Sequence, residues 1–382
     1  MPTDTPWWEE FRDLMPVTRQ WAYFDHAAVA PLSTPVADAL TAWTRDSVEN
    51  GAVHWSGWRE RVEAVRQLGA ELIGADESEI AIVRNTTEGV TLVAEGVRWQ
   101  PGDNVVVPAG EFPSNRLPWE NLADRGVELR VVPNESEHLD LDRLESYCDE
   151  RTRIVSVSWV GYATGWRNDL ETLAVIAHRH GAKLFVDAIQ GLGVLPLDVS
   201  TTGIDFLSAD SHKWLLGPEG AGLFFARREC LKELRPFGLG WNSVERPGNF
   251  DATDARLKQS AARYEGGTYN MAGVAGLEAA LRLVLRFGIA EISARLLEVT
   301  DRLCQCLESE CGAVIVSQRD TERRSGIVAF DLPGCDLRRV RRSARDAGVV
   351  LNVRGGHLRV SPHVYTNDAD VDRLMVTLQA RN

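Results

Sequence analysis

The chain has 382 residues, of which 44% are hydrophobic, and its formal net charge is -13. A chain of this size can bury a large core and fits two domains. The negative charge argues against a nucleic-acid partner, because phosphate binding needs a basic surface. We expect neither a secretory signal in the acidic, aromatic N-terminus nor a membrane span, which needs roughly 18 apolar residues in a row, and therefore expect a cytoplasmic protein.

Short apolar strands alternate with amphipathic helices between about residues 60 and 230. This alternation predicts an α/β domain, in which a mostly parallel sheet is covered by helices on both faces. The expected strands are 79–84, 103–109, 127–132, 152–160, 182–188, 205–209 and 221–227, and the helices between them include 61–74, 88–97 and 170–181.

The pattern changes after about residue 270. Long helices are followed by short strands, which predicts a compact α+β unit of about a hundred residues. We predict a large domain over 20–270 and a small C-terminal domain over 271–382, with residues 1–19 packing on the small domain. The elements expected in the small domain are helices at 271–288, 291–309 and 336–348, strands at 325–332, 349–353 and 357–361, and a closing helix.

The cysteines predict neither a disulfide framework nor a metal site. A chain this long does not need disulfides to stabilise its core. Cys304, Cys306 and Cys311 fall on one expected helix, where Cys304 and Cys306 point to different faces and no histidine is near. We therefore expect no bound metal.

Reactive residue types follow several of the expected strands, and ligands of open α/β sheets bind beyond the carboxyl ends of the strands. Thr86 and Thr87 lie between a strand and a helix, a position that suits either a phosphate or an ordinary helix cap. Asp187 lies at the end of a buried strand, with Gln190 three residues further on. A buried carboxylate there needs a partner or caps the following turn.

Lysine is rare in this chain and occurs at positions 183, 213, 232 and 258. Of these, Lys213 alone lies in an apolar, glycine-flanked setting. A desolvated lysine can lose its proton and act as a nucleophile, which arginine cannot do. Lys213, Asp187 and the two threonines on one sheet edge are the combination that pyridoxal phosphate requires: an amine, a carboxylate for the pyridinium nitrogen and a phosphate site.

The segment VDAIQGLGVLPLDVSTTGIDFLSADSHKWLLGPEGAGLFFAR at 186–227 resembles the signature of class V aminotransferases. This group of fold-type I pyridoxal-phosphate enzymes includes cysteine desulfurases and isopenicillin N epimerase. The resemblance extends from YFDHAAVAPLSTPV at 23–36 to LRVSPHVYTNDADVDRL at 358–374. It implies the fold of type I pyridoxal-phosphate-dependent transferases, with a large domain around a mostly parallel sheet and a small α+β domain.

The resemblance also implies roles at the cofactor. Lys213 would be the Schiff-base lysine, Asp187 would pair with the pyridinium nitrogen, and Gln190 would approach the phenolic oxygen. Phe112, in EFPSN, stands where desulfurases carry a histidine that stacks on the pyridine ring. The residues expected around the phosphate are Thr86, Thr87, Asp210, His212 and, from the neighbouring subunit of a homodimer with a shared active site, Thr268.

Arg359 lies in the alternating strand HLRVSPH, and family members use an arginine in this motif to hold the α-carboxylate of the substrate. Arg354 is a nearby competitor for this role. The other residues expected on the substrate side are His26, His54 and Tyr162, with Trp55, Trp58, Trp166 and Trp241 as further candidates for the pocket wall or for core packing.

Departures from the family pattern bear on the reaction. The stretch VVLNVRGGHL at 349–358 contains no cysteine where desulfurases carry the one that forms a persulfide, and the loop is short. Cys335 lies too far upstream to replace it. Asp210 replaces a serine of the desulfurases, and Trp159 and Tyr162 replace a histidine and an asparagine. These departures disfavour a cysteine desulfurase and favour the epimerase-like branch.

We therefore predict a pyridoxal-phosphate enzyme that acts at the α-carbon of a small-molecule amino acid, as a transaminase or an epimerase. The alternative is a C–S lyase that resembles cysteine desulfurases but lacks their cysteine. A nicotinamide-dependent enzyme is disfavoured, because neither GLGVLP nor GPEGAG opens a helix after a strand. A binding protein without catalytic activity on the same fold is the remaining alternative.

Overall fold

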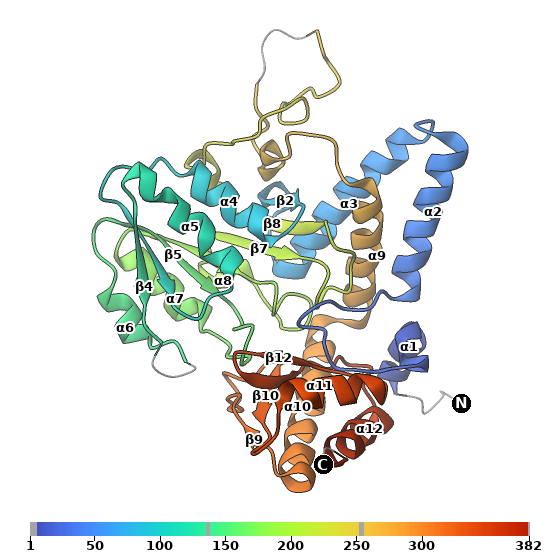
Figure 1. The fold of residues 1–382 in the computed structure, drawn as a ribbon. Coiled ribbons are helices and arrows are strands. Elements are labelled where there is room, and N and C mark those ends of the chain that lie inside the picture. Colours follow the sequence, from blue (N-terminus) through green and yellow to red (C-terminus); the bar gives the residue numbers. More distant parts are fainter. Residues whose placement is uncertain (1–5, 135–137, 252–255, 381–382) are drawn as a thin grey trace.

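The structure is a computed structural model and describes residues 6–134, 138–251 and 256–380. A large α/β body holds the central sheet, and a smaller unit formed mainly by the C-terminal part of the chain lies against it (Figure 1). Residues 1–5 of the predicted N-terminal segment lie outside the described residues. The predicted fold class is confirmed: a large, mostly parallel sheet is joined to a small α+β unit.

The central sheet has seven strands in the order β2-β8-β7-β6-β5-β3-β4. Strand β8 is antiparallel to both of its neighbours, and the other neighbouring pairs are parallel. Each strand lies within about two residues of its predicted bounds. The strands are β2 (Ile80–Val83), β3 (Asn104–Pro108), β4 (Glu128–Val132), β5 (Thr152–Ser158), β6 (Lys183–Asp187), β7 (Phe206–Asp210) and β8 (Gly222–Ala226).

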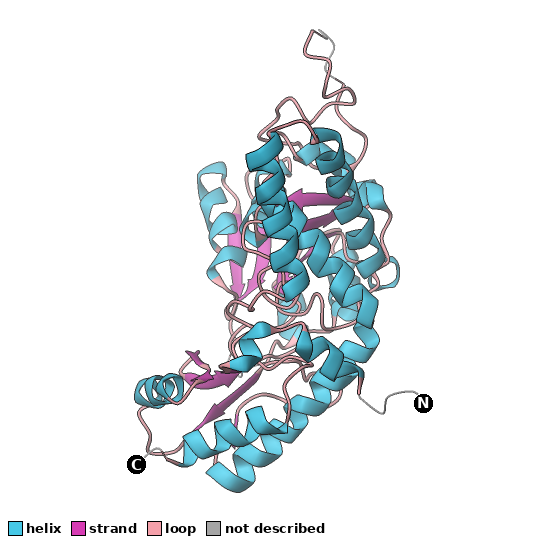
Figure 2. Ribbon diagram, turned by 90° about the vertical axis from the view of Figure 1, so that its right-hand side faces the viewer, coloured by secondary structure: helices cyan, strands magenta, loops and turns pink. Residues whose placement is uncertain are grey.

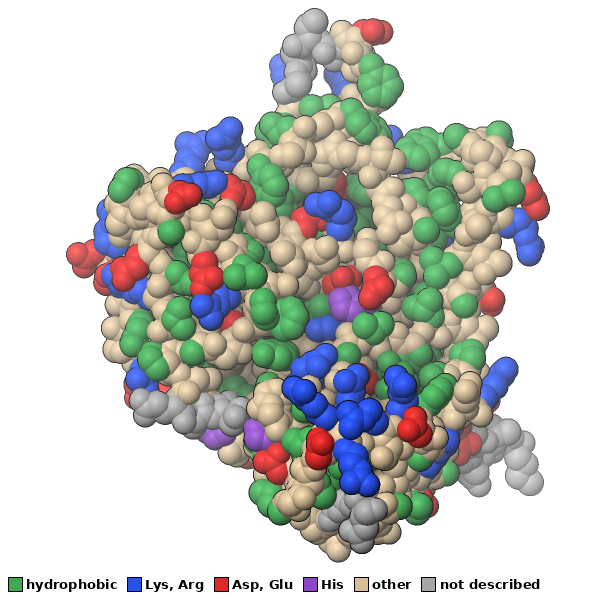
Figure 3. Space-filling view, viewed as in Figure 1, with side chains coloured by type: hydrophobic (Ala, Val, Ile, Leu, Met, Phe, Trp, Pro, Cys, Tyr) green, Lys and Arg blue, Asp and Glu red, His purple; other side chains and the backbone are tan. Residues whose placement is uncertain are grey.

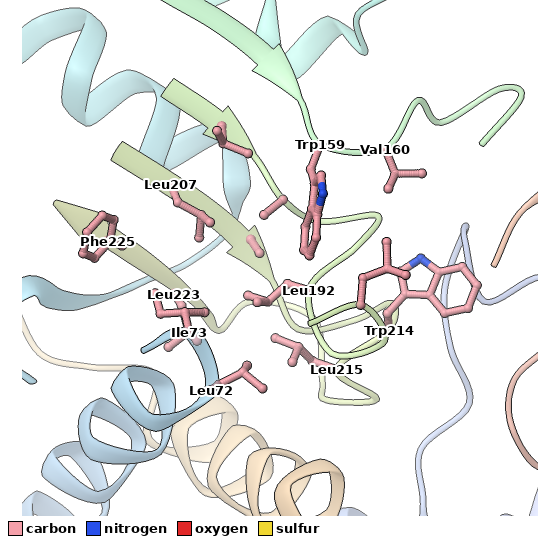
Figure 4. Close-up of a cluster of buried hydrophobic side chains, with 14 of the residues drawn as sticks. Leu72, Ile73, Trp159, Val160, Leu192, Leu207, Trp214, Leu215, Leu223 and Phe225 are labelled. Carbon is pink, nitrogen blue, oxygen red and sulfur yellow. The ribbon is translucent and has the colours of Figure 1, made fainter. Parts of the chain in front are cut away.

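Each face of this sheet has its own hydrophobic core, because successive residues of a strand point to opposite faces. Val106 and Leu207 belong to a cluster that includes residues of α3 and α7, and Figure 4 shows part of it. Val105 and Phe206 belong to a second cluster, with residues of α4. Burial on both faces explains the nearly continuous apolar strands. The helices of this body include α3 (Trp55–Ile73), α4 (Thr86–Gly96), α5 (Leu117–Glu120), α6 (Leu141–Ser146), α7 (Leu170–Arg179) and α8 (Val199–Thr202).

Helix α2 (Thr34–Asn50) is absent from the sequence-based prediction. Val36, Leu40 and Trp43 recur at helical spacing along it, although Val36 is its one buried residue. It packs along α9 (Met271–Phe287), which also packs along α3, and the three helices stand side by side in Figure 1. The predicted domain boundary at residue 270 stays a proposal, because α9 follows that boundary but packs on helices of the large body.

The small unit contains a four-stranded sheet in the order β12-β13-β10-β9, with helices packed on it (Figure 2). Residues near the N-terminus join it: β1 (Ala22–Tyr23) pairs with β11 (Val349–Val350), and Arg12 of α1 (Trp7–Asp13) forms an ion pair with Asp370. The other elements are β9 (Val314–Ile315), β10 (Val328–Asp331), β12 (Asn352–Arg354), β13 (His357–Val360), α10 (Ile289–Cys311), α11 (Leu337–Asp346) and α12 (Asp368–Gln379).

The surface charge is unevenly distributed although the chain is acidic overall. Figure 3 shows Lys and Arg side chains gathered on the face of the small unit over α11, whose exposed arginines are Arg338, Arg339, Arg341, Arg342 and Arg345. Within the described ranges, no helix is both long enough and apolar enough to cross a membrane. Among those same residues, no group of three or more His, Cys, Asp or Glu side chains is arranged to hold a metal ion.

Candidate active site

The carboxyl ends of the parallel strands meet at one edge of the central sheet. Side chains from this edge form the candidate site, and β13 of the small unit adds one more. The contributing residues are Thr86 and Thr87 after β2, Glu111 and Phe112 after β3, Ser158 in β5, Asp187 in β6, Asp210 in β7, Lys213 after β7 and Arg359 in β13.

The turn that carries Lys213 is held in place by its own backbone and by a buried neighbour. The N–H of Leu216 donates to the carbonyl of Lys213 at 3.0 Å, and Leu216 has a φ of 60°, in the left-handed region that non-glycine residues rarely adopt. Trp214 is buried in the core cluster of Figure 4, and its indole N–H donates to Oε1 of Gln190 at 2.9 Å. These contacts fix the direction in which Lys213 leaves the sheet edge.

The Lys213 amine lies in a largely dry environment. Burial lowers the pKa of this lysine to about 8, although Asp187 and Asp210 oppose the shift and Arg359 adds to it. Its Nζ is 5.8 Å from the centre of the Phe112 ring. About a tenth of the amine is therefore neutral at pH 7, far more than for an ordinary lysine, and this neutral form is the nucleophile.

Asp187 is 3% exposed and accepts a hydrogen bond from the N–H of Ile189 at 3.1 Å. Burial raises the pKa of Asp187 to about 6, and the Ile189 hydrogen bond and the Lys213 charge act against this rise. Among the described residues, no side chain donates a hydrogen bond to its carboxylate. The carboxylate can therefore accept a further donor, and the protonated ring nitrogen of pyridoxal phosphate fits that need.

The N-terminus of α4 forms a candidate phosphate site. Asn85 caps this helix by accepting the N–H of Glu88, which leaves the N–H groups of the first turn at Thr86 and Thr87 to an external acceptor. Oγ1 of Thr87 donates to Oγ of Ser114 at 2.8 Å, so two hydroxyl groups lie together at this helix end. Oγ1 of the buried Thr86 accepts the N–H of Asp210 at 3.0 Å and ties α4 to β7. The donor set suits an anion.

Asp210 and His212 form a pair beside this helix end. Nδ1 of His212 is 2.9 Å from Oδ2 of Asp210, which is an ion-pair distance, although the angles are not those of a hydrogen bond. Oδ1 of Asp210 accepts the N–H of Ser211 at 2.7 Å. A carboxylate repels a phosphate at close range, so these contacts favour an indirect role for Asp210 through His212.

Gln190 is buried and uses both ends of its amide inside the protein. Nε2 donates to the carbonyl of Ala27 at 3.0 Å, and Oε1 accepts from Trp214. An amide nitrogen carries two protons, so one donor remains for a cofactor oxygen.

Arg359 is 1% exposed, and its guanidinium is only partly satisfied by the protein. Nη1 donates to the carbonyl of Tyr162 at 2.6 Å, and Nη2 is 3.2 Å from Oδ1 of Asp25. Nε is buried and has no partner among the described residues. Arg354, the competitor, bonds Asn352 and a backbone carbonyl of its own strand. The open donor makes Arg359 the better candidate for a substrate carboxylate.

The segment between Arg354 and Arg359 is a tight hairpin. Gly355 and Gly356 join β12 to β13 with φ values of 58° and 89°, a left-handed backbone that favours glycine at both positions of a two-residue turn. The short loop expected from the sequence is thus confirmed. Cys335 lies apart from it, in the turn before α11, where its thiol is 3.9 Å from the carbonyl of Pro333.

The structure does not support a substrate contact by His26. The side chain is fully buried, with Nδ1 2.8 Å from the carbonyl of Ser361 and Nε2 2.6 Å from the hydroxyl of Tyr365. Burial lowers the pKa of His26 to about 4. Because both ring nitrogens are engaged, His26 is a neutral core residue that links the N-terminal segment to the small unit.

Two further predicted residues lie away from Lys213. His54 is exposed at the start of α3, where Nδ1 is 2.6 Å from Oδ1 of Asp46. Thr268 is exposed and lines a cavity of about 350 Å³ together with Arg84 and Phe237. Tyr162, by contrast, is at the site, where its ring packs against Phe112 with centres 5.3 Å apart.

Asp25 and Glu111 are two further site residues that were not predicted from the sequence. Both are carboxyl groups that bond site residues, Asp25 with Arg359 and Glu111 with Ser158. Both stand directly beside residues that the motifs single out, His26 and Phe112, and this adjacency is the one signal that could have pointed to them.

Comparisons with known proteins agree with this geometry. The family model "Aminotransferase class-V" matches residues 22–374. A probable cysteine desulfurase of Methanothermobacter thermautotrophicus is 32% identical over 97% of each chain. The apo structure of a cysteine desulfurase from Thermococcus onnurineus superposes with a TM-score of 0.88 at 27% identity, covering 98% of each chain. A C-DES mutant with glycine linked to pyridoxal phosphate has a TM-score of 0.91 at 24% identity, covering 97% of this chain and 99% of its own.

Proposed function

Because the chain belongs to the class V aminotransferase family, whose cofactor is pyridoxal phosphate, we propose that it is a C–S lyase that acts on a sulfur-containing amino acid. The relatives named as cysteine desulfurases support this alternative and not the main prediction of a transaminase or an epimerase. The half-buried Lys213 with its lowered pKa supports catalysis over a role as a binding protein.

The residues at the sheet edge fit the cofactor, because they offer an amine, a carboxylate that accepts no side-chain hydrogen bond among the described residues, and an anion site at a helix end. When bound, pyridoxal phosphate supplies an electron sink that makes the α-proton of an amino acid removable. In our proposal Lys213 holds the cofactor and moves the α-proton, Asp187 faces the ring nitrogen, and the first turn of α4 binds the phosphate. Arg359 holds the α-carboxylate of the substrate.

The single observation that carries the choice of reaction is the hairpin at Gly355–Gly356. Among the described residues, this hairpin leaves no loop beside Arg359 on which a cysteine could approach the substrate sulfur, so this segment offers no sulfur acceptor. We propose that Lys213 takes the α-proton and that the Cβ–S bond breaks with its electron pair going to sulfur. With one water, a substrate R–S–CH2–CH(NH3+)–COO− then yields R–SH, pyruvate and ammonium.

We also propose that the enzyme is a homodimer with a shared site. Two residues expected at the site, His54 and Thr268, lie on the surface in cavities whose linings do not include Lys213. A segment around residues 237–250 projects from the large body in Figure 1 and exposes apolar side chains that a second copy would cover. These side chains are Phe237, Leu239, Trp241 and Phe250.

Product analysis tests the proposed reaction. The cofactor-loaded protein is incubated separately with cystine, cysteine and alanine, and pyruvate is measured together with released sulfur. We expect pyruvate from a sulfur amino acid and none from alanine, with no turnover by Lys213→Ala. Racemised alanine, or cofactor that accumulates as pyridoxamine phosphate, would contradict the proposal and restore the epimerase or transaminase.

A further inference from the structure

Glu111 places a second carboxyl group at the same sheet edge as Asp187, and no role at the cofactor site has been given to it above. It lies between the end of β3 and the end of β5. Oε1 accepts the N–H of Ser158 at 2.6 Å, and Oε2 lies within hydrogen-bond distance of the Ser158 hydroxyl. Oε2 also accepts from Nδ2 of Asn115 at 2.9 Å. All of these partners can donate, so the contacts suit the ionised carboxylate.

The strand register brings Glu111 next to Asp187. Ser158, which Glu111 bonds through both backbone and hydroxyl, is the direct partner of Asp187 in the parallel β5–β6 pair. Neighbouring strands lie about 4.8 Å apart, and paired residues of a sheet present their side chains on the same face. The two carboxyl groups are therefore neighbours, with Asp187 buried and Glu111 half-buried.

Opposing influences set the pKa of Glu111. Burial raises the pKa of Glu111 to about 7, the Asn115 and Ser158 hydrogen bonds lower it, and the Asp187 charge raises it further. Asp187, on β6, is the charged group that faces it, and Lys213 faces Asp187 in turn. A positive charge placed against Asp187 would relieve the repulsion and favour ionised Glu111.

We propose that Glu111 is a positioning residue that holds the end of β5 beside Asp187 and supplies a second negative charge that keeps the ring nitrogen of the cofactor protonated. The two carboxylates would share the task of stabilising one pyridinium cation. This inference rests on the cofactor alone and is independent of which substrate the enzyme uses or which bond it breaks.

The test needs no substrate, so its failure is distinct from a failure of the proposed reaction. Holoenzyme is reconstituted with pyridoxal phosphate labelled with nitrogen-15 in the ring, and the protonation of that nitrogen is followed by NMR against pH. We expect the midpoint to fall by about one pH unit in Glu111→Gln, a change of about tenfold in the protonation equilibrium. Glu111→Asp keeps the charge and should restore most of the difference.

Ser158→Ala is the matched control. It keeps the Glu111 carboxyl group and the backbone donor but removes one of the hydrogen bonds that lower the pKa of Glu111, so its midpoint should fall clearly less than that of Glu111→Gln. An unchanged midpoint in Glu111→Gln, or an equal fall in Ser158→Ala, would overturn the proposal.

A second measurement covers the case in which Glu111→Gln does not fold. In wild-type protein labelled with carbon-13 in its glutamate carboxyls, the Glu111 signal is assigned by its loss in Glu111→Asp. We expect it to titrate near neutral pH without cofactor and at clearly lower pH with cofactor. Identical titrations in the two states would overturn the proposal.

Discussion

Asp187, at the end of β6, and Lys213, in the turn after β7, are coupled by charge at the buried edge of the sheet. The Lys213 charge opposes the rise in the pKa of Asp187, and the Asp187 charge opposes the fall in the pKa of Lys213. Burial is the largest influence on both groups, so each is kept closer to neutrality than in water. The site therefore holds two groups whose charges a ligand can change at moderate pH.

Cofactor capture should depend on pH through Lys213. Its pKa of about 8 means that the neutral amine becomes more abundant as the pH rises toward that value. We expect the rate of covalent capture of pyridoxal phosphate to rise roughly tenfold per unit below pH 8 and to level off above it. Stopped-flow absorbance of cofactor-free protein measures this rate. A rate that does not change between pH 6 and 9 would show that Lys213 is not the titrating nucleophile.

Replacing Asp187 should affect the apoprotein and the holoenzyme in opposite ways. Its pKa is raised from 3.8 to about 6 in the folded protein, so the folded state binds the proton more tightly than the unfolded state. Stability is therefore lost as the pH rises from about 4 to about 6, and the ionised group costs on the order of 3 kcal/mol above that range. Asp187→Asn should stabilise the apoprotein at pH 8 and leave it unchanged near pH 4, as urea unfolding measures.

In the holoenzyme the same substitution should be harmful, whereas it stabilises the apoprotein. Asparagine cannot offset the charge of a protonated ring nitrogen, so we expect slower turnover and weaker cofactor binding in Asp187→Asn. Turnover equal to that of the wild type would remove Asp187 from the cofactor site.

Substrate carboxylate binding should depend on Arg359 and not on Arg354. Loss of a charge-assisted pair at a buried site costs about 1.5–3 kcal/mol, so Arg359→Lys should lower kcat/KM by roughly 10- to 150-fold. Arg354→Lys is the matched control, because Arg354 bonds its own strand, and it should change kcat/KM by less than about threefold. Equal losses in the two variants would contradict the assignment. Lysine retains a positive charge beside the buried Asp25 and so limits the loss of stability.

Mixed dimers test whether the site is shared. Lys213→Ala and Thr268→Ala subunits are unfolded together and refolded as a mixture. If Thr268 serves the site of the partner subunit, one site of each mixed dimer is intact, and random pairing should restore about a quarter of the wild-type activity. No recovery above the two separate variants would mean that both residues act within one subunit or that no dimer forms.

The sequence was sufficient for the strands of the large sheet and for the grouping of Lys213 with Asp187. Both depend on local signals, namely apolar runs and residues at strand ends. Helix α2 was missed although Val36, Leu40 and Trp43 recur in it at helical spacing, because the prediction of alternating strands and helices began only near residue 60. His26 was misplaced for another reason: its neighbours Ser361 and Tyr365 lie more than three hundred residues away in the chain, and no local pattern reports that contact.

Glu111 could not be predicted as a site residue for the same reason, because its contacts depend on residues far away in the chain. Its sequence neighbourhood does not reveal that Ser158 bonds it or that Ser158 pairs with Asp187, because both facts depend on strand register. The relatives back the alternative that was kept, a C–S lyase, better than the main prediction of a transaminase or an epimerase. The missing cysteine was read correctly from the sequence, but it was taken to favour an epimerase, whereas the relatives named as desulfurases favour a C–S lyase.

The fate of the substrate carbon is the most direct test of the proposed C–S lyase reaction. Cofactor-loaded protein is given cystine or cysteine labelled with carbon-13 at Cβ, and carbon NMR follows the label, with Lys213→Ala as the control. We expect the label to appear in the methyl group of pyruvate, with one sulfur-containing product released per pyruvate, and neither product in the control. Label in the methyl group of alanine, with sulfur retained on the protein, would contradict it and identify a cysteine desulfurase.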